Sequence, residues 1–203
     1  MKGYFKNHEK TKEMMPDGKW LLSGDVGILH PNGSLQIIDR VKNIFKLSQG
    51  EYIAPEKLEN VYVKSKWLLQ CWIHGDSLHD FVIMFAVLDP ATVKSHWGDA
   101  PDLDDPAKIA EVMADVYQLA TEAKFNSLEK PKQFKFFSKP WTEHDVLTPT
   151  MKLKRNVAAQ TYAAEIKALY AKGPFADPGA KANVAPTTSK PADQAVAKAN
   201  AAE

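Results

Sequence analysis

The sequence predicts an α+β fold, in which helices cover a small β-sheet. Residues 81–88 read FVIMFAVL and have no polar face, as expected for a central strand that is buried on both sides. Residues 106–125 carry apolar side chains at the 3.6-residue spacing of an amphipathic helix that packs on such a sheet. Pro31, Asn32 and Gly33 separate two short apolar runs, which indicates a β-hairpin early in the chain.

The composition fits a globular chain and excludes several classes of protein. The 203 residues are 44% hydrophobic with a formal charge of +1, enough for one good core or two small ones. This balance gives no basic face for nucleic acid. The longest apolar run, residues 81–88, is far short of the roughly twenty residues that span a bilayer. We therefore expect no nucleic-acid partner, no transmembrane helix and, from the first residues, no signal peptide.

Two residue types that often carry chemistry are expected to be structural here. Cys71 is the single cysteine and lies in an apolar run, which indicates a buried thiol in a reducing compartment. The six histidines show no HExxH pattern and no cysteine partner, so no metal site is expected within the chain.

Short elements are expected before the central strand. They are a polar helix at residues 9–15, a short buried strand at 20–22, hairpin strands at 28–29 and 35–38, and a strand at 44–47. A helix is expected to begin at Glu56, because Pro55 suits a first helical turn and acidic side chains such as Glu59 complement the helix dipole.

The rest of the chain is expected to complete the sheet and its covering helices. The elements are strands at residues 68–74, 81–89 and 133–137, and helices at 91–97, 106–125 and 156–172. The last helix is expected to turn Val157, Tyr162, Ile166, Leu169 and Tyr170 toward the core. Residues 173–203 are rich in Ala, Lys and Pro and are predicted to be a disordered tail.

Polar side chains without an obvious core role concentrate in two stretches. In the first, Asp25 follows a glycine, and charge replaces hydrophobicity at Arg40 and Lys42, which marks a joint. Ser48, Gln49, Gly50 and Glu51 then form a predicted turn. In the second stretch, Lys152 lies in a segment whose proline and threonines indicate a loop.

A purely structural interpretation stays open for each of these residues. Asp25 could satisfy its own turn, and Arg40 and Lys42 could be solvated charges of a linker. Gly50 could serve only a tight turn. Lys152 could belong to a solvated basic run that continues through residue 155.

Four stretches resemble the adenylate-forming superfamily and, within it, the long-chain fatty acyl-CoA synthetases. They are MKGYFKNHEKTKE, LLSGDVG, IIDRVKNIFKLSQGEYIAPEKLE and LTPTMKLKR. They occur in the family's order and together cover roughly residues 1–170. The resemblance implies a small C-terminal lid domain at residues 41–172, with a three-stranded sheet flanked by helices. Residues 1–40 would be a β-hairpin remnant of the large N-terminal adenylation domain.

The resemblance also implies roles for single residues. Asp25 would accept hydrogen bonds from both ribose hydroxyls of ATP, since a carboxylate offers two acceptor oxygens. Arg40 would hold the ribose or phosphate side of the nucleotide, and Lys42 would be the hinge about which the lid turns. Lys152 would be the catalytic residue that stabilises the negative charge developing on the α-phosphate.

The remaining site residues line the expected path of coenzyme A. In the family, the loop of Ser48, Gln49, Gly50 and Glu51 lines the tunnel through which the pantetheine thiol reaches the adenylate. Three departures from the family pattern occur elsewhere: Ser23 replaces a threonine, Lys19 is one extra residue, and Met151 replaces the usual glycine. A bulky apolar residue at this last position is common in the long-chain branch.

The activity implied is that of an ATP-dependent long-chain fatty acid–CoA ligase, an acid-thiol ligase that forms acyl-AMP and then acyl-CoA, AMP and pyrophosphate. Its substrates would be a long-chain fatty acid, ATP with Mg²⁺, and CoA. The phosphate loop and the acyl pocket are not in this sequence, so we expect a C-terminal fragment or truncated gene product that needs the missing N-terminal adenylation domain and is inactive alone.

The expected location is cytoplasmic or on the surface of an intracellular membrane, with peripheral membrane association of the full enzyme. Two alternatives to this interpretation stay open. One is a non-catalytic or split-enzyme lid module that acts as an interaction domain. The other is an incomplete gene model.

Overall fold

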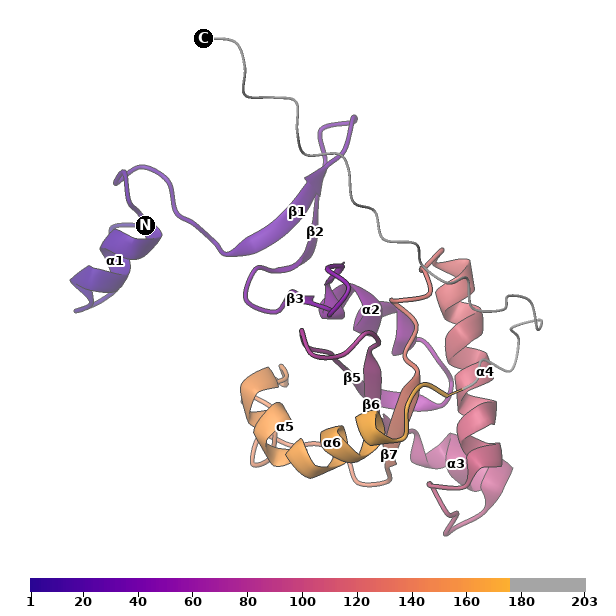
Figure 1. The fold of residues 1–203 in the computed structure, drawn as a ribbon. Helices are drawn as coiled ribbons and strands as arrows, with labels where there is room; N and C mark the ends of the chain where they lie inside the picture. Colours follow the sequence, from indigo (N-terminus) through magenta and orange to yellow (C-terminus); the bar gives the residue numbers. More distant parts are fainter. Residues whose placement is uncertain (176–203) are drawn as a thin grey trace, which may run out of the picture.

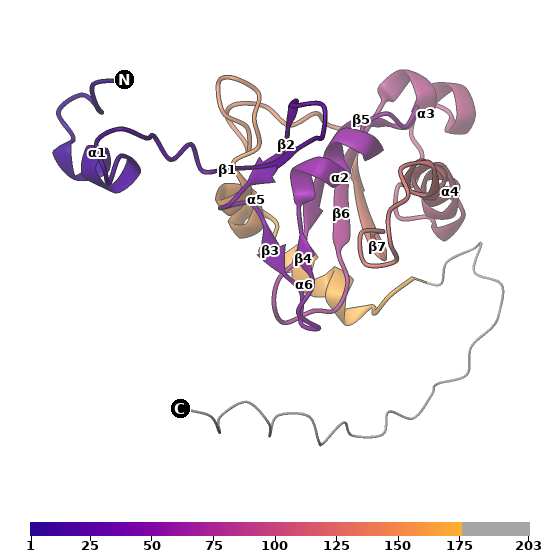
Figure 2. The same cartoon turned by 90° about the horizontal axis from the view of Figure 1, so that it is seen from above.

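The computed structural model describes residues 1–175, which form six helices and seven strands (Figure 1). In chain order they are α1 (His8–Met14), β1 (Asp25–Leu29), β2 (Leu35–Arg40), β3 (Phe45–Lys46), β4 (Tyr52–Ile53), α2 (Pro55–Tyr62), β5 (Leu68–His74), β6 (Ile83–Leu88), α3 (Pro90–Trp97), α4 (Pro106–Glu122), β7 (Gln133–Phe137), α5 (Arg155–Thr161) and α6 (Ala163–Ala171). Helix α1 and its flanking loops extend away from the main body, to which the hairpin β1–β2 connects them (Figures 1 and 2).

The centre of the fold is a three-stranded mixed sheet in the order β5-β6-β7. Strand β6 runs antiparallel to β5 and parallel to β7, and a crossover through α3 and α4 joins β6 to β7. Every residue of β6 is buried. The α+β class and the central strand covered on both sides are therefore confirmed.

Alternate side chains of β6 enter two separate cores. Met84 and Ala86 pack in a core that includes side chains of α2 and α4. Ile83 and Phe85 point to the other face and pack in a core that includes side chains of α5 and α6. Figure 2 shows α4 on one side of the sheet and the pair α5 and α6 on the other.

Helix α4 confirms the amphipathic pattern, although it ends at Glu122, before the expected boundary. Its start is fixed by Asp105, whose carboxylate accepts a hydrogen bond of 2.9 Å from the backbone N–H of Ala107. Its buried residues are Val112, Met113, Val116, Tyr117 and Ala120. Lys124 adopts a φ of 58°, which turns the chain so that Phe125 still reaches the core.

The expected hairpin is also confirmed. Strands β1 and β2 pair antiparallel, and the His30 N–H donates to the Ser34 carbonyl at 2.9 Å across the turn. The strands β3 and β4 form a second ribbon of two residues each. The strand at Tyr52–Ile53 was not expected, because so short a run has no alternating pattern to detect.

The expected buried strand at residues 20–22 is wrong. This segment has no strand conformation, and the Trp20 side chain is 75% exposed. Its backbone donates two hydrogen bonds, from the Trp20 N–H to the Asp17 Oδ1 at 2.9 Å and from the Leu22 N–H to the Met14 carbonyl at 2.8 Å. Apolar residues form a buried strand only beside another strand, and within residues 1–175 no strand lies next to this segment.

The expected single helix at residues 156–172 is wrong as well. Tyr162, with φ −103° and ψ 24°, leaves helical geometry and separates α5 from α6. Within α5, Ala158 is the buried residue and Val157 is exposed, contrary to the expectation for Val157. Leu169 and Tyr170 reach the core as expected.

Part of the predicted disordered tail is ordered. The Gly173 carbonyl accepts a hydrogen bond of 2.7 Å from the Gln133 side chain, and the Phe175 N–H donates to the Lys132 carbonyl at 2.8 Å. Phe175 also packs against the core that contains α4. The rest of the predicted tail, residues 176–203, lies outside the described residues.

Gly75 allows the loop after β5 to pass close to Phe45. A Cβ atom at this position would lie 2.4 Å from Cε2 of the Phe45 ring. We expect Gly75→Ala to lower the free energy of unfolding by about 2 kcal/mol, because added atoms in a packed site force neighbours to move. Urea denaturation measures this change. In a Phe45→Leu background the same substitution should cost less than half as much; an equal cost would show that this contact is not the cause.

Candidate functional site

A polar cleft of about 620 Å³ lies between the end of the hairpin, helix α2 and the loop that precedes α5. Arg40 and Asn43 line it on the hairpin side, and Thr148 and Lys152 line it on the loop side. Two residues singled out in the sequence, Arg40 and Lys152, therefore face one cleft although they lie far apart in the chain.

Asp25 and Arg40 stand opposite each other at the base of the hairpin. They are register partners in the β1–β2 ladder, and the Arg40 Nε lies 3.2 Å from the Asp25 Oδ1. Both residues are exposed, so this pair contributes little to stability and both side chains are accessible to a ligand. The Asp25 N–H donates to the Ser23 Oγ at 3.2 Å, so the serine hydroxyl supports this turn.

Asp39 is a buried residue of this site that the sequence analysis missed. Its side chain is 1% exposed, and its carboxylate accepts hydrogen bonds from the Arg40 N–H (2.6 Å), the Asn43 amide (3.1 Å) and the Glu56 N–H (2.8 Å). The N-cap residue of α2, Ala54, provides no side-chain cap. The Asp39 carboxylate takes the place of this cap by accepting the hydrogen bond of the Glu56 N–H, and the negative charge of Asp39 complements the dipole of α2.

Lys42 lies in the turn that joins the hairpin to β3. The N–H groups of Asn43 and Ile44 donate to the Arg40 carbonyl at 2.9 and 3.2 Å, which closes this turn. The Lys42 side chain is exposed. The position expected to be a hinge is thus a short connection between the hairpin and the body of the fold.

The loop of Ser48, Gln49, Gly50 and Glu51 connects β3 to β4 and does not line the cleft. Gly50 has a φ of 98°, a conformation that favours glycine, and an added Cβ would meet only the Lys46 Cε at 3.8 Å. The turn conformation alone therefore accounts for this glycine.

The chain segment after β5 supports this loop. The Ser48 N–H donates to the His79 carbonyl, and the Gln49 amide donates to the Asp80 carbonyl, both at 3.0 Å. The His79 ring stacks on Tyr170 of α6 and lies 2.8 Å from an Asp76 carboxylate oxygen. The loop is therefore anchored to the 75–80 segment and separate from Lys152.

The loop that carries Lys152 is closed by backbone hydrogen bonds. The Thr148 N–H donates to the Lys152 carbonyl at 2.7 Å, and the Lys152 N–H donates to the Thr148 Oγ1 at 3.0 Å. Leu147 and Leu153 form an antiparallel bridge. Within residues 1–175 the Lys152 ammonium group makes no hydrogen bond and no ion pair, so it is free to meet an anion.

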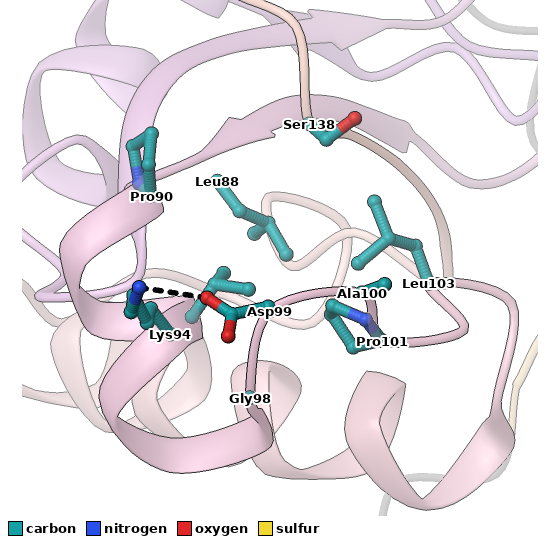
Figure 3. Close-up of a pocket in the computed structure, with 10 residues that line it drawn as sticks. Leu88, Pro90, Lys94, Gly98, Asp99, Ala100, Pro101, Leu103 and Ser138 are labelled. Atoms are coloured by element: carbon teal, nitrogen blue, oxygen red, sulfur yellow. Dashed lines mark ion pairs between the residues drawn. The ribbon is translucent and has the colours of Figure 1, made fainter.

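A second hollow, of about 540 Å³, lies between α3 and the loop at residues 98–103 (Figure 3). Leu88 and Leu103 point into it, and the Lys94 ammonium is paired with the Asp99 carboxylate at 2.8 Å. This hollow shares no lining residue with the cleft, and its one lysine is already paired. The cleft is therefore the better anion site.

Two further properties concern metals and membranes. In the part of the chain that the structure describes, no group of three or more His, Cys, Asp or Glu side chains is placed to hold a metal ion. Among the same residues, each helix is too short or too polar to cross a bilayer.

Comparison with known proteins identifies relatives of the chain, although no protein-family model matches it. It is 41% identical over 180 residues to long chain acyl-CoA synthetase 7, peroxisomal, of Arabidopsis thaliana; the match covers 84% of this chain and 26% of that protein. It is 42% identical over 177 residues to long-chain-fatty-acid–CoA ligase 5 of Mus musculus, covering 83% and 26%. The chain is homologous to the long-chain acyl-CoA synthetases.

Solved structures agree with this relationship. The adenylation domain of a carboxylic acid reductase from Segniliparus rugosus, in complex with AMP and a co-purified carboxylic acid, matches with a TM-score of 0.73 at 29% identity, covering 84% of this chain and 26% of that chain. The expected resemblance to the adenylate-forming fold is confirmed. The chain spans about a quarter of the length of the long-chain acyl-CoA synthetases that it matches.

Met151 has a φ of 62°, and the sequence resemblance implies that glycine is usual at this position. A side chain with a Cβ costs about 1–2 kcal/mol in this conformation. We expect Met151→Gly to raise the free energy of unfolding by about 0.5–1 kcal/mol, since the strain relieved exceeds the added flexibility of the unfolded chain. Met151→Ala keeps the strain and is the matched control in the same denaturation experiment. Equal stabilisation by alanine would contradict this explanation.

His74, at the end of β5, predicts a pH-dependent stability for this acyl-CoA synthetase homologue. Burial lowers the pKa of His74, an effect that His79 increases and that Asp76 opposes. The unfolded chain therefore binds a proton at His74 near pH 6.5 while the folded chain resists it. We expect the free energy of unfolding to fall as the pH drops below about 6.5. The His74→Gln variant should lose part of this dependence below about pH 6.5; equal slopes in this range would contradict the assignment.

Proposed function

We propose that this chain is the lid part of an ATP-dependent long-chain fatty acid–CoA ligase. A carboxylate oxygen of the fatty acid attacks the α-phosphorus of ATP, which enters as its Mg²⁺ complex, and pyrophosphate leaves. The CoA thiolate then attacks the carbonyl carbon of the acyl-AMP, and AMP leaves. Homology to the long-chain acyl-CoA synthetases supports the class of reaction.

The observation that carries this proposal is the shared cleft of Arg40 and Lys152. Lys152 is an exposed ammonium group with no partner among the described residues, on a loop whose backbone is closed by hydrogen bonds. A fixed cation of this kind stabilises the negative charge that develops on an α-phosphate during transfer. We assign Lys152 the catalytic role in the first half-reaction.

Asp25 and Arg40 fit the nucleotide side of the same reaction. Their side chains lie 3.2 Å apart at the hairpin base. The Asp25 carboxylate can accept hydrogen bonds from a diol, and the adjacent Arg40 guanidinium can donate hydrogen bonds to an anion. This combination matches a ribose joined to a phosphate. The AMP-bound adenylation domain of similar fold supports a nucleotide as the ligand.

The position of the loop at Ser48–Glu51 supports the proposed hinge. This loop and Lys152 lie in separate places in the fold, so one reacting centre cannot meet both without a rotation of the lid. Lys42 lies in the turn between the hairpin and the body, where a change in few backbone angles would reorient the whole body. We propose that Lys152 serves acyl-AMP formation and that Ser48, Gln49, Gly50 and Glu51 line the CoA path after rotation.

Exposed apolar side chains of the hairpin and of the segment before it support a large adenylation domain as partner. Phe5 and Leu29 are 88% and 72% exposed, and the other exposed large apolar residues among residues 1–41 are Met1, Tyr4, Trp20, Leu21, Leu22, Ile28, Leu35, Ile37 and Val41. An apolar surface of this extent normally contacts another surface. We propose that it packs on the domain that supplies the phosphate loop and the acyl pocket, and that the chain is inactive without it.

The test is acyl-CoA formation from ATP, CoA and palmitate. We expect activity from the chain mixed with the separately expressed adenylation domain of a relative, and none from either part alone. Lys152→Ala should lower the rate by about 100- to 1000-fold, the usual effect of losing one electrostatic contact to the transition state. Lys167→Ala, at an exposed lysine of α6, is the matched control and should leave the rate unchanged.

Two outcomes would contradict the proposal. Activity of the chain alone would show that it does not need an adenylation domain. A folded chain that stays inactive in the mixture would favour a non-catalytic module that binds a partner through the hairpin surface.

A further inference from the structure

We propose that the ion pair between Glu59 and Arg155 positions Lys152 across the cleft from Arg40. This inference rests on the proposed function, because it concerns the geometry in which Lys152 meets an α-phosphate. Glu59 and Arg155 both line the cleft, and their pairing with each other leaves them to act as positioning residues through Lys152.

The pair is a bidentate, largely buried salt bridge. The Arg155 Nη1 and Nη2 donate to the two carboxylate oxygens of Glu59 at 2.8 and 2.6 Å, and the Ile73 N–H donates to the same carboxylate at 2.9 Å. The side chains of Arg155 and Glu59 are only 18% and 14% exposed. A guanidinium in this arrangement is fixed in direction as well as in distance.

Arg155 transmits this fixed position to Lys152 through a short, hydrogen-bonded path. It is the first residue of α5, directly after the closed loop. Between the two residues, Leu153 is bridged to Leu147, and the Lys154 N–H donates to the Val146 carbonyl at 2.7 Å. A displacement of Arg155 therefore moves the loop that carries Lys152.

Helix α2 connects this contact to the opposite wall of the cleft. Glu59 projects from α2, and the first turn of α2 is held by Asp39 through the Glu56 N–H at 2.8 Å. Asp39 immediately precedes Arg40. Helix α2 thus sets the separation of Arg40 from Lys152. Asp39 contacts the start of this helix, and Glu59, farther along it, contacts Arg155.

The chemistry of the pair favours a geometric role over a stabilising one. Burial raises the pKa of the Glu59 carboxyl, and the hydrogen bonds and charge of Arg155 oppose that shift. Desolvation of two charges offsets much of their attraction, so a buried pair of this kind adds little net stability. What it provides is a specific orientation of two segments.

Hydrogen exchange of the full chain tests the positioning without any need for activity. We expect Glu59→Gln to speed exchange at the Lys152 and Lys154 amides by about tenfold or more, while amides of β6 stay protected. Arg155→Lys keeps the positive charge but loses the bidentate contact of the guanidinium, and should give a smaller increase in the exchange rate. Asp104→Asn is the matched control, because it removes an exposed carboxylate that binds Lys135 through both oxygens, at 2.7 and 2.9 Å.

Kinetic measurements on the chain mixed with an adenylation domain distinguish positioning of Lys152 from a merely structural role of the ion pair. We expect Glu59→Gln to lower kcat for acyl-AMP formation by about tenfold or more, as small misplacements do. KM for ATP should change less than about twofold, because the variant keeps the contacts that bind ATP before the reaction. The rate of CoA transfer from supplied acyl-AMP should also change less than about twofold.

The outcomes that overturn the inference are distinct from failure of the proposed function. Unchanged exchange at the loop in Glu59→Gln, or equal loss of protection in β6, would show that the pair does not position Lys152. Equal slowing of both half-reactions would show a structural role only. A mixture inactive even with the unaltered chain would refute the proposed function, while the exchange result would still decide whether the pair fixes the loop.

Discussion

Burial of β6 on both faces is the constraint on which the arrangement of this chain depends. Because its side chains alternate between two cores, helices must cover the sheet on both sides: α2 and α4 on one, α5 and α6 on the other. This arrangement brings α2 and the start of α5 together near strand β5, where the Ile73 N–H and Arg155 meet the Glu59 carboxylate. The cleft is a consequence of that packing.

Two carboxylates give helix α2 a role beyond its contribution to the core. Asp39 binds the first turn from the connection to the hairpin, and Glu59 binds the loop of Lys152 from the middle of the helix. Both acceptors are shielded from water, so their hydrogen bonds are directional and leave few alternative arrangements. In the proposed positioning, the helix acts as a spacer between the two walls of the cleft.

The same packing keeps the two chemically suggestive loops apart. The loop around Gly50 is hydrogen-bonded to the segment after β5, whereas Arg155, which follows the loop of Lys152, is paired with Glu59 of α2. Under the proposed function, this separation would let the chain present one loop at a time to the adenylation domain, as a reaction in two steps requires. The short turn at Lys42 is where we propose this change of orientation, because few backbone angles would need to change there.

The sequence by itself determined the features that depend on local periodicity and turn chemistry. These are the apolar run of β6, the amphipathic pattern of α4, the hairpin, and the motifs that place Lys152 in a loop. Only the tertiary structure decided which segments meet. Asp39 reaches a helix 17 residues away, and Glu59 pairs with Arg155 at a separation of 96. Neither contact leaves a local pattern, and the break at Tyr162 and the exposure of Trp20 depend on which surfaces lie beside them.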